Sequence, residues 1–233
     1  MSRWLIQLQG EKLDLEEFPR WFPNGEVYGL AEKGAYYLTG RALDLAGNAD
    51  AVLQRATEAL NEYSAVISLL WNAFRKPSIG QVIHEDDAGK QNAYIFVSGI
   101  ASGRSKVSGG LVDASGTAPK PNTTQAQDLL AVAKASPNLR EALSVWADPI
   151  RTWGRLFRVI EEIEQHFGKP VEQAGICSNA ELVRFRRTAN TAESAGVDAR
   201  HASGRFKPPA DPMSLEQGSS FVAQLLEKTL RKK

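Results

Sequence analysis

Three stretches near the amino terminus have the apolar patterning of β-strands. Residues 4–9 alternate apolar and polar side chains before a glycine, which predicts a strand. Residues 26–40 contain two β-rich runs separated by residues 31–34, and residues 79–99 contain two more around a turn at residues 87–89. Each pair predicts a β-hairpin, because a short polar turn joins strands that then lie antiparallel.

A long helix is predicted between the two hairpins. Apolar residues recur at helical spacing from Asn48 onward, and Pro77 ends the pattern because proline cannot continue a helix. The apolar face of this helix is broad, which suits packing against a sheet. Residues 1–98 are therefore expected to form a small α+β domain.

The composition changes in residues 99–124, where glycine, serine, alanine and proline dominate and apolar runs are short. Such stretches are typical of linkers and loops. The spacing of a phosphate-binding Gly-x-x-x-x-Gly-Lys-Ser/Thr loop is absent from this segment. We therefore predict that residues 99–124 are the linker or loop between two domains.

The carboxy-terminal part, residues 125–233, is predicted to be a bundle of four to five helices. The expected helices cover residues 124–135, 136–147, 148–168, 178–190 and 214–233. The residues expected to cap them are Ser136, Asp148, Gly168, Ser178 with Glu181, and Ser214 with Gln217. The fold class expected for the chain is thus α+β, a small sheet-plus-helix domain followed by an all-α helical bundle.

Composition limits the classes of protein and site that are compatible with the chain. No run of about 18 apolar residues is present and the amino terminus turns acidic, so we expect no membrane span and a cytoplasmic location. Cys177 is the single cysteine, which excludes an internal disulfide and a cysteine-based zinc site. Because the three histidines are scattered, we expect no metal and no cofactor. Motifs of serine hydrolases and dinucleotide-binding enzymes are absent.

Charge is distributed unevenly, although the whole chain carries only +1. Residues 1–150 contain 14 basic and 17 acidic side chains, a net −3, and residues 151–233 contain 14 and 10, a net +4. Residues 184–209 alone contain six Lys and Arg against two acids, again +4. Such a surface attracts anionic partners, but basic patches of this size also occur on solvated faces that bind nothing.

This basic segment covers the end of one predicted helix and the loop before the last one. Arg184, Arg187 and Asn190 recur at helical spacing and should project from one face. Cations there also complement the helix dipole, which is a purely structural explanation. The predicted loop of about 20 residues is longer than bundle connections usually are, and such loops are either functional or disordered.

The order of elements around the segment resembles that of the HEPN superfamily, helical domains of bacterial proteins that act on nucleotides and RNA, many of them in phage-defence and toxin systems. The resemblance covers roughly residues 135–233: the helix WGRLFRVIEEIEQHFG, a helix ending in Arg and Asn, a loop with a histidine, and a final helix. In that family an Arg, four to six residues and a His form the ribonuclease motif, usually completed across a dimer interface. Here Arg200 adjoins His201 and thirteen residues separate Arg187 from it, so this spacing is absent.

The resemblance implies metal-independent RNA cleavage by these residues. His201 would be the general acid or base, while Arg187 and Arg200 would hold the phosphate. The residues expected to bind nucleic acid are Arg184, Arg186, Asn190, Arg205 and Lys207. Considered from the sequence alone, His201 is also explained as a loop histidine in contact with solvent or with Asp198.

Three functions follow as hypotheses. The first is a HEPN-like ribonuclease of a bacterial defence or toxin system, which acts on RNA as a homodimer and works with a partner protein of that system. The second is a non-catalytic nucleic-acid-binding module that uses the same basic loop. The third is a protein-interaction or assembly subunit. The charge asymmetry, the long basic loop and the family resemblance together favour a nucleic-acid-related role.

Overall fold

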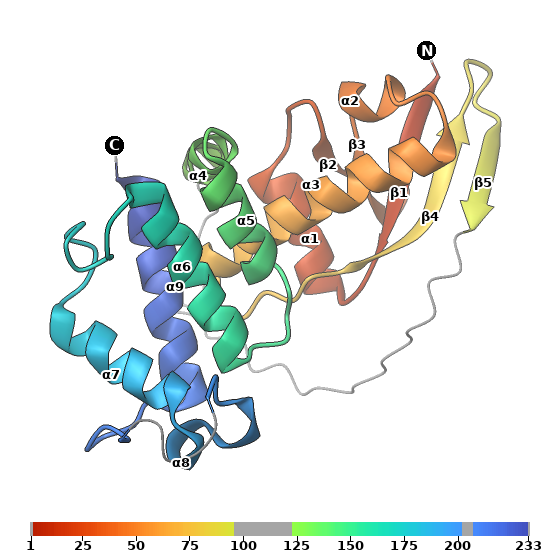
Figure 1. The fold of residues 1–233 in the computed structure, drawn as a ribbon. Coiled ribbons are helices and arrows are strands. Elements are labelled where there is room, and N and C mark those ends of the chain that lie inside the picture. Colours follow the sequence, from red (N-terminus) through yellow and green to blue (C-terminus); the bar gives the residue numbers. More distant parts are fainter. Residues whose placement is uncertain (1, 96–122, 202–206, 233) are drawn as a thin grey trace, which may run out of the picture. The chain divides into compact units, whose positions relative to one another are not determined.

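The computed structural model of the chain describes residues 2–95, 123–201 and 207–232. Strands and helices make up the first part and helices alone the second, so the α+β class expected from the sequence is confirmed (Figure 1). The chain divides into two compact units, residues 1–127 and 128–233, which are described separately.

The division between the two units lies inside helix α4 (Thr123–Lys134), which matches the first helix predicted after the linker. The predicted linker itself, residues 99–124, lies outside the described residues except for the first two positions of α4. Its role as a linker therefore stays a prediction.

The first unit is built on a five-stranded antiparallel sheet with the strand order β2-β3-β1-β4-β5. The strands are β1 (Arg3–Gln9), β2 (Tyr28–Glu32), β3 (Ala35–Thr39), β4 (Ser78–Glu85) and β5 (Gln91–Ile95). Both predicted hairpins are confirmed. The first turns at Lys33 and Gly34, whose positive φ angles of 52° and 78° suit the two-residue turn that matches strand twist.

Three helices belong to this unit: α1 (Lys12–Trp21), α2 (Arg41–Asp44) and α3 (Ala49–Leu70). The predicted long helix is α3, and Asn48 caps it by accepting the Ala51 N–H at 2.9 Å. Helix α3 ends at Leu70, before the predicted stop. The alternation β1-α1-β2-β3-α3-β4, with β1 and β3 central among these four strands, is a split βαβ arrangement that β5 extends at one edge.

Helices α1 and α3 pack against each other and against the sheet. Phe22, which follows α1, stacks on Tyr63 of α3 with ring centroids 4.0 Å apart. Gly29 of β2 lies directly against the α1 backbone, where an added Cβ would stand 2.4 Å from the carbonyl carbon of Phe18 and 2.5 Å from the nitrogen of Pro19. This close approach requires glycine, because two backbones cannot move apart without disturbing the packing of the whole helix.

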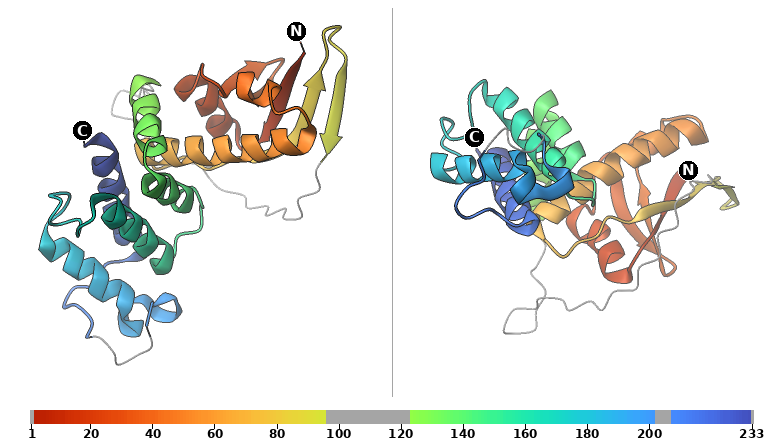
Figure 2. Two further views of the ribbon diagram at one scale, coloured as in Figure 1. Left: turned by 45° about the horizontal axis from the view of Figure 1, so that its top comes forward. Right: turned by 60° about the horizontal axis from the view of Figure 1, so that its bottom comes forward.

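The second unit contains the remaining helices, with α6 beside α5 and α9 (Figure 2). They are α5 (Pro137–Trp146), α6 (Trp153–Phe167), α7 (Asn179–Asn190), α8 (Ala192–Ala195) and α9 (Leu215–Arg231), with a 3₁₀ turn η1 (Gly196–Asp198) after α8. The predicted caps that are confirmed are Ser136, Gly168, and the two capping boxes of Ser178 with Glu181 and Ser214 with Gln217.

Two expectations about this unit were wrong. Asp148 does not cap α6, because the helix begins five residues later with Thr152 as its cap. Asp148 instead accepts the N–H of Ile150 at 2.8 Å, a local turn that competes with helix formation. The predicted loop without secondary structure contains α8 and η1, so its first part is ordered as short helical turns.

The core of the second unit is organised around Phe185 of α7, whose side chain is fully buried. Its ring lies 5.7, 6.1 and 5.6 Å from the rings of Trp153, Phe157 and Phe221, respectively. Gly218 of α9 faces the Trp153 ring, which would stand 2.6 Å from an added Cβ. Helices α6, α7 and α9 therefore meet through one aromatic cluster.

We expect Gly29→Ala to lower the free energy of unfolding by about 1–3 kcal/mol, the usual cost of overpacking a close-packed interior. Gly154→Ala is the matched control, since its Cβ would meet nothing within 4 Å. It should leave stability unchanged or raise it by up to about 1 kcal/mol, because alanine favours the helix more than glycine does. Urea unfolding followed by circular dichroism measures both. Equal stability of the two variants would contradict the close approach of α1 to β2.

Candidate functional site

The predicted functional segment begins on α7, and its local sequence determines where that helix starts. The Ser178 hydroxyl accepts the Glu181 N–H at 3.2 Å, while the Glu181 carboxylate accepts the Ser178 N–H at 3.2 Å and its hydroxyl at 2.6 Å. These bonds lower the pKa of Glu181 below its usual value. Capping at this position places Arg184 and Arg186 near the middle of the helix and Arg187 in its last turn, where a cation complements the helix dipole.

Arg184 is bound to the segment that precedes α9. Its guanidinium donates to the backbone carbonyl of Asp211 at 2.7 Å and forms an ion pair with the carboxylate of the same residue at 2.7 Å. The Thr188 hydroxyl reinforces this junction by accepting the N–H of Met213 at 3.1 Å. Arg184 therefore holds the segment before α9 in place, and its charge is paired with that of Asp211.

Arg186 is bound to α6. Its guanidinium lies 2.7 Å from a carboxylate oxygen of Glu164, which also accepts the backbone N–H of Val171 at 3.2 Å. One carboxylate thus joins α7, α6 and the connection between them. The residues predicted to bind nucleic acid at positions 184 and 186 are both held by acidic partners in the same unit.

Arg200 returns the chain to α7 and packs on α6. Its backbone N–H donates to the carbonyl of Ala189 at 3.0 Å, which brings residues 200 and 201 to the last turn of α7. Its guanidinium lies 3.8 Å from the centre of the Phe157 ring and 3.2 Å from a carboxylate oxygen of Glu161. Both side-chain contacts are with α6, so Arg200 anchors the segment that carries His201.

The other predicted residues differ in exposure. Arg187 is exposed on the last turn of α7 and forms no ion pair with another described residue. Lys207 is exposed, and His201 is half-buried. Asn190 is half-buried, and its side-chain oxygen has no hydrogen-bond partner among the described residues. Arg205 lies outside the described residues.

The charge count from the sequence overestimates the positive charge of this surface. Three of the six basic residues in residues 184–209 are paired with carboxylates. Those partners, Asp211, Glu164 and Glu161, all lie outside that range of the sequence, two of them on α6. Sequence proximity could not have identified them, because the packing of α6 and of the segment before α9 brings them to the arginines.

Among the residues that the structure describes, the remaining reactive groups do not form a conventional catalytic cluster. Burial, with smaller contributions from Glu181 and Glu172, raises the pKa of the Cys177 thiol to about 11, so this thiol stays protonated at neutral pH. In the described ranges no group of three or more His, Cys, Asp and Glu side chains is arranged to hold a metal ion. At the β4–β5 turn, Asp86 accepts the N–H groups of Ala88 and Lys90, which is the role of a turn residue.

Comparison of the chain with protein-family models, with curated proteins and with solved structures gave no match. The resemblance to the HEPN superfamily therefore rests on the order of elements and the residues quoted above. The search for membrane-spanning helices, made over the described residues, found none of sufficient length and apolarity.

We expect Arg200 and Glu161 to be energetically coupled. Each of Arg200→Ala and Glu161→Ala should lower the free energy of unfolding, and a double-mutant cycle should give a coupling of about 0.2–1 kcal/mol, the range for ion pairs that are partly exposed. Arg200→Ala should cost about 0.5–1 kcal/mol more than Glu161→Ala because it also removes the contact with the Phe157 ring. Additive single effects in thermal unfolding would contradict the ion pair.

Proposed function

We propose that the helical unit binds RNA at the surface formed by the end of α7, residues 199–201 and Lys207, and that it cleaves RNA without a metal ion. The observation that carries the proposal is the hydrogen bond from the Arg200 N–H to the Ala189 carbonyl. It supports the proposal because it joins Ala189, two residues after Arg187, to Arg200, which adjoins His201, although thirteen residues separate Arg187 from His201 in the sequence.

Each side chain has a distinct role in this proposal. Arg187, exposed at the helix end, contacts a phosphate, and its planar guanidinium suits the bidentate geometry of that contact. His201 takes the proton of the attacking 2′-hydroxyl or gives one to the leaving oxygen. Arg200 is a positioning residue, because its guanidinium is engaged with Phe157 and Glu161 and its backbone presents His201 beside α7.

The HEPN resemblance adds the biological setting to the proposal. It suggests a protein of a bacterial defence or toxin system, controlled by a partner protein of that system. It also suggests that two copies of the chain complete one site. A dimer would place two Arg187 and two His201 side chains on one RNA, which suits a surface where three arginines are already neutralised.

Binding without cleavage is the second candidate, and the engagement of Arg200 favours it. Cleavage requires cationic donors aimed at the charge that develops on the phosphate. With Arg200 bound to α6, Arg187 and Lys207 are the exposed cations that this surface offers among the described residues. Contacts from these two cations to phosphates would give weak binding that depends on salt concentration.

We expect His201→Ala to reduce metal-independent cleavage of labelled single-stranded RNA at least about 100-fold, since loss of a general acid or base has effects of that size. His166→Ala is the matched control, because His166 lies in the last turn of α6 in the same unit and its Nδ1 lies 2.9 Å from the Ser136 hydroxyl. Cleavage is measured in EDTA after circular dichroism has established that all three proteins are folded.

Cleavage by the parent and by His166→Ala, but not by His201→Ala, would support the catalytic proposal. Equal cleavage by all three proteins would contradict it. Salt-sensitive binding without cleavage would leave the second candidate, and the absence of both would remove RNA as the ligand.

We expect Arg187→Gln to weaken RNA binding and to reduce the slope of log Kd against log salt concentration by about 0.7, the value for one phosphate contact on a single strand. Lys169→Gln removes an equally exposed cation from the connection after α6 and should leave the slope unchanged. Fluorescence anisotropy over a salt series measures both. Equal slope changes in the two variants would indicate unspecific attraction to the whole unit.

A further inference from the structure

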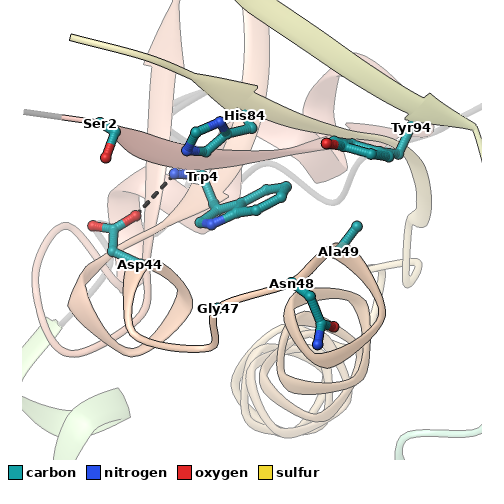
Figure 3. Close-up of a pocket in the computed structure, with 8 residues that line it drawn as sticks. All are labelled: Ser2, Trp4, Asp44, Gly47, Asn48, Ala49, His84 and Tyr94. Atoms are coloured by element: carbon teal, nitrogen blue, oxygen red, sulfur yellow. Dashed lines mark hydrogen bonds between the residues drawn. The ribbon is translucent and has the colours of Figure 1, made fainter.

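The first unit has an open pocket of about 470 Å³ between one end of the sheet and the connection from α2 to α3 (Figure 3). This volume lies in the range of about 300–1,000 Å³ that is usual for small-molecule sites. The proposed RNA surface uses none of the residues that line it. Any ligand of this pocket is therefore separate from RNA bound at that surface.

Aromatic side chains from three strands form one wall of the pocket. Trp4 of β1 lies opposite His84 of β4, and their ring centroids are 4.6 Å apart. Tyr94 of β5 extends the row, with its ring centroid 5.8 Å from that of Trp4 and 43% of the residue exposed. In Figure 3 the three rings face the α2–α3 connection. A ligand entering here meets π-faces and ring edges on one side.

Asp44 provides the charge of the pocket. One of its carboxylate oxygens accepts the Trp4 backbone N–H at 2.8 Å, which fixes the acid beside the aromatic wall. Among the described residues, the pocket lining contains no Lys, Arg or Glu and no second Asp. An anionic ligand would have to approach this carboxylate with no described Lys or Arg in the lining to offset the repulsion.

The amino terminus of α3 also borders the pocket, and a helix amino terminus normally favours anions. Here the preference is reduced in two ways. The Asn48 side chain already accepts the N–H of Ala51, and Asp50 places a second carboxylate in the first turn. With Asp44 nearby as well, the acidic groups at this helix end exceed what its partial positive charge of about half a unit can balance.

We propose that this pocket binds an organic cation with an apolar body, such as a quaternary ammonium compound or a protonated amine. The cationic group lies against the aromatic wall, where the ring quadrupoles attract it, and pairs with the Asp44 carboxylate. The apolar body covers the exposed part of Tyr94. This assignment does not depend on RNA binding by the other unit.

The test is calorimetric titration of the full chain with benzyltrimethylammonium, together with ¹H–¹⁵N spectra that follow the tryptophan indole signals. Benzyl alcohol and benzoate are the neutral and anionic counterparts of this probe. Asp44→Asn removes the charge and keeps an oxygen that accepts the Trp4 N–H. The matched control is Asp50→Asn, which removes a charge from α3 outside the pocket lining.

We expect the cation to bind saturably and to shift an indole signal that Trp4→Phe removes. Asp44→Asn should weaken binding at least about 5-fold and Tyr94→Leu at least about 3-fold, while Asp50→Asn, outside the lining, should weaken it less than either. Absence of cation binding, tighter binding of benzoate, or equal affinity for the cation and benzyl alcohol would each overturn the proposal. So would equal weakening by Asp44→Asn and Asp50→Asn.

Discussion

The aromatic cluster around Phe185 is the constraint on which the geometry of the helical unit depends. Trp153, Phe157 and Phe221 contact its ring from α6 and α9, so α7 is held between two helices by side chains that cannot shift independently. Phe157 also carries the Arg200 guanidinium. The position of the segment with His201 therefore depends on how the core packs. A substitution that moved Phe157 would also disturb the contact of its ring with Arg200.

The second organising feature is the use of carboxylates from α6 and from the approach to α9 to bind arginines of residues 184–209. Glu161 and Glu164 lie three positions apart on α6 and receive Arg200 and Arg186, respectively. The sequence suggested that these arginines were available for a ligand. In the structure they form ion pairs that connect elements of the unit. It leaves Arg187 as the arginine of α7 that has no described acidic partner, which concentrates any recognition of an anion at one end of the helix.

The sequence predicted the features that depend on local chemistry. Capping boxes at Ser178 and Ser214 and the glycine at position 168 act within one helical turn, and all three were predicted correctly. Helix α1 was not predicted, because its pattern contains Pro19 and its packing depends on the contact with Gly29, a residue from a different element. Two further features could not be predicted from the sequence, because each also joins different elements. They are the pairing of Arg200 with Glu161 and the position of three aromatic residues beside Asp44. Arg200 and Glu161 are 39 positions apart, and Trp4 is 40 positions from Asp44.

The hydrogen bond that holds Arg200 at the end of α7 has a thermodynamic consequence for a ligand that binds at His201. A free loop would lose backbone freedom on binding, at about 1–2 kcal/mol for each residue that becomes fixed. Here a backbone hydrogen bond, a ring contact and an ion pair restrict the segment before any ligand arrives. That entropy is lost when the protein folds, so residues 200 and 201 are preorganised, and more of the interaction energy with a ligand is available as affinity.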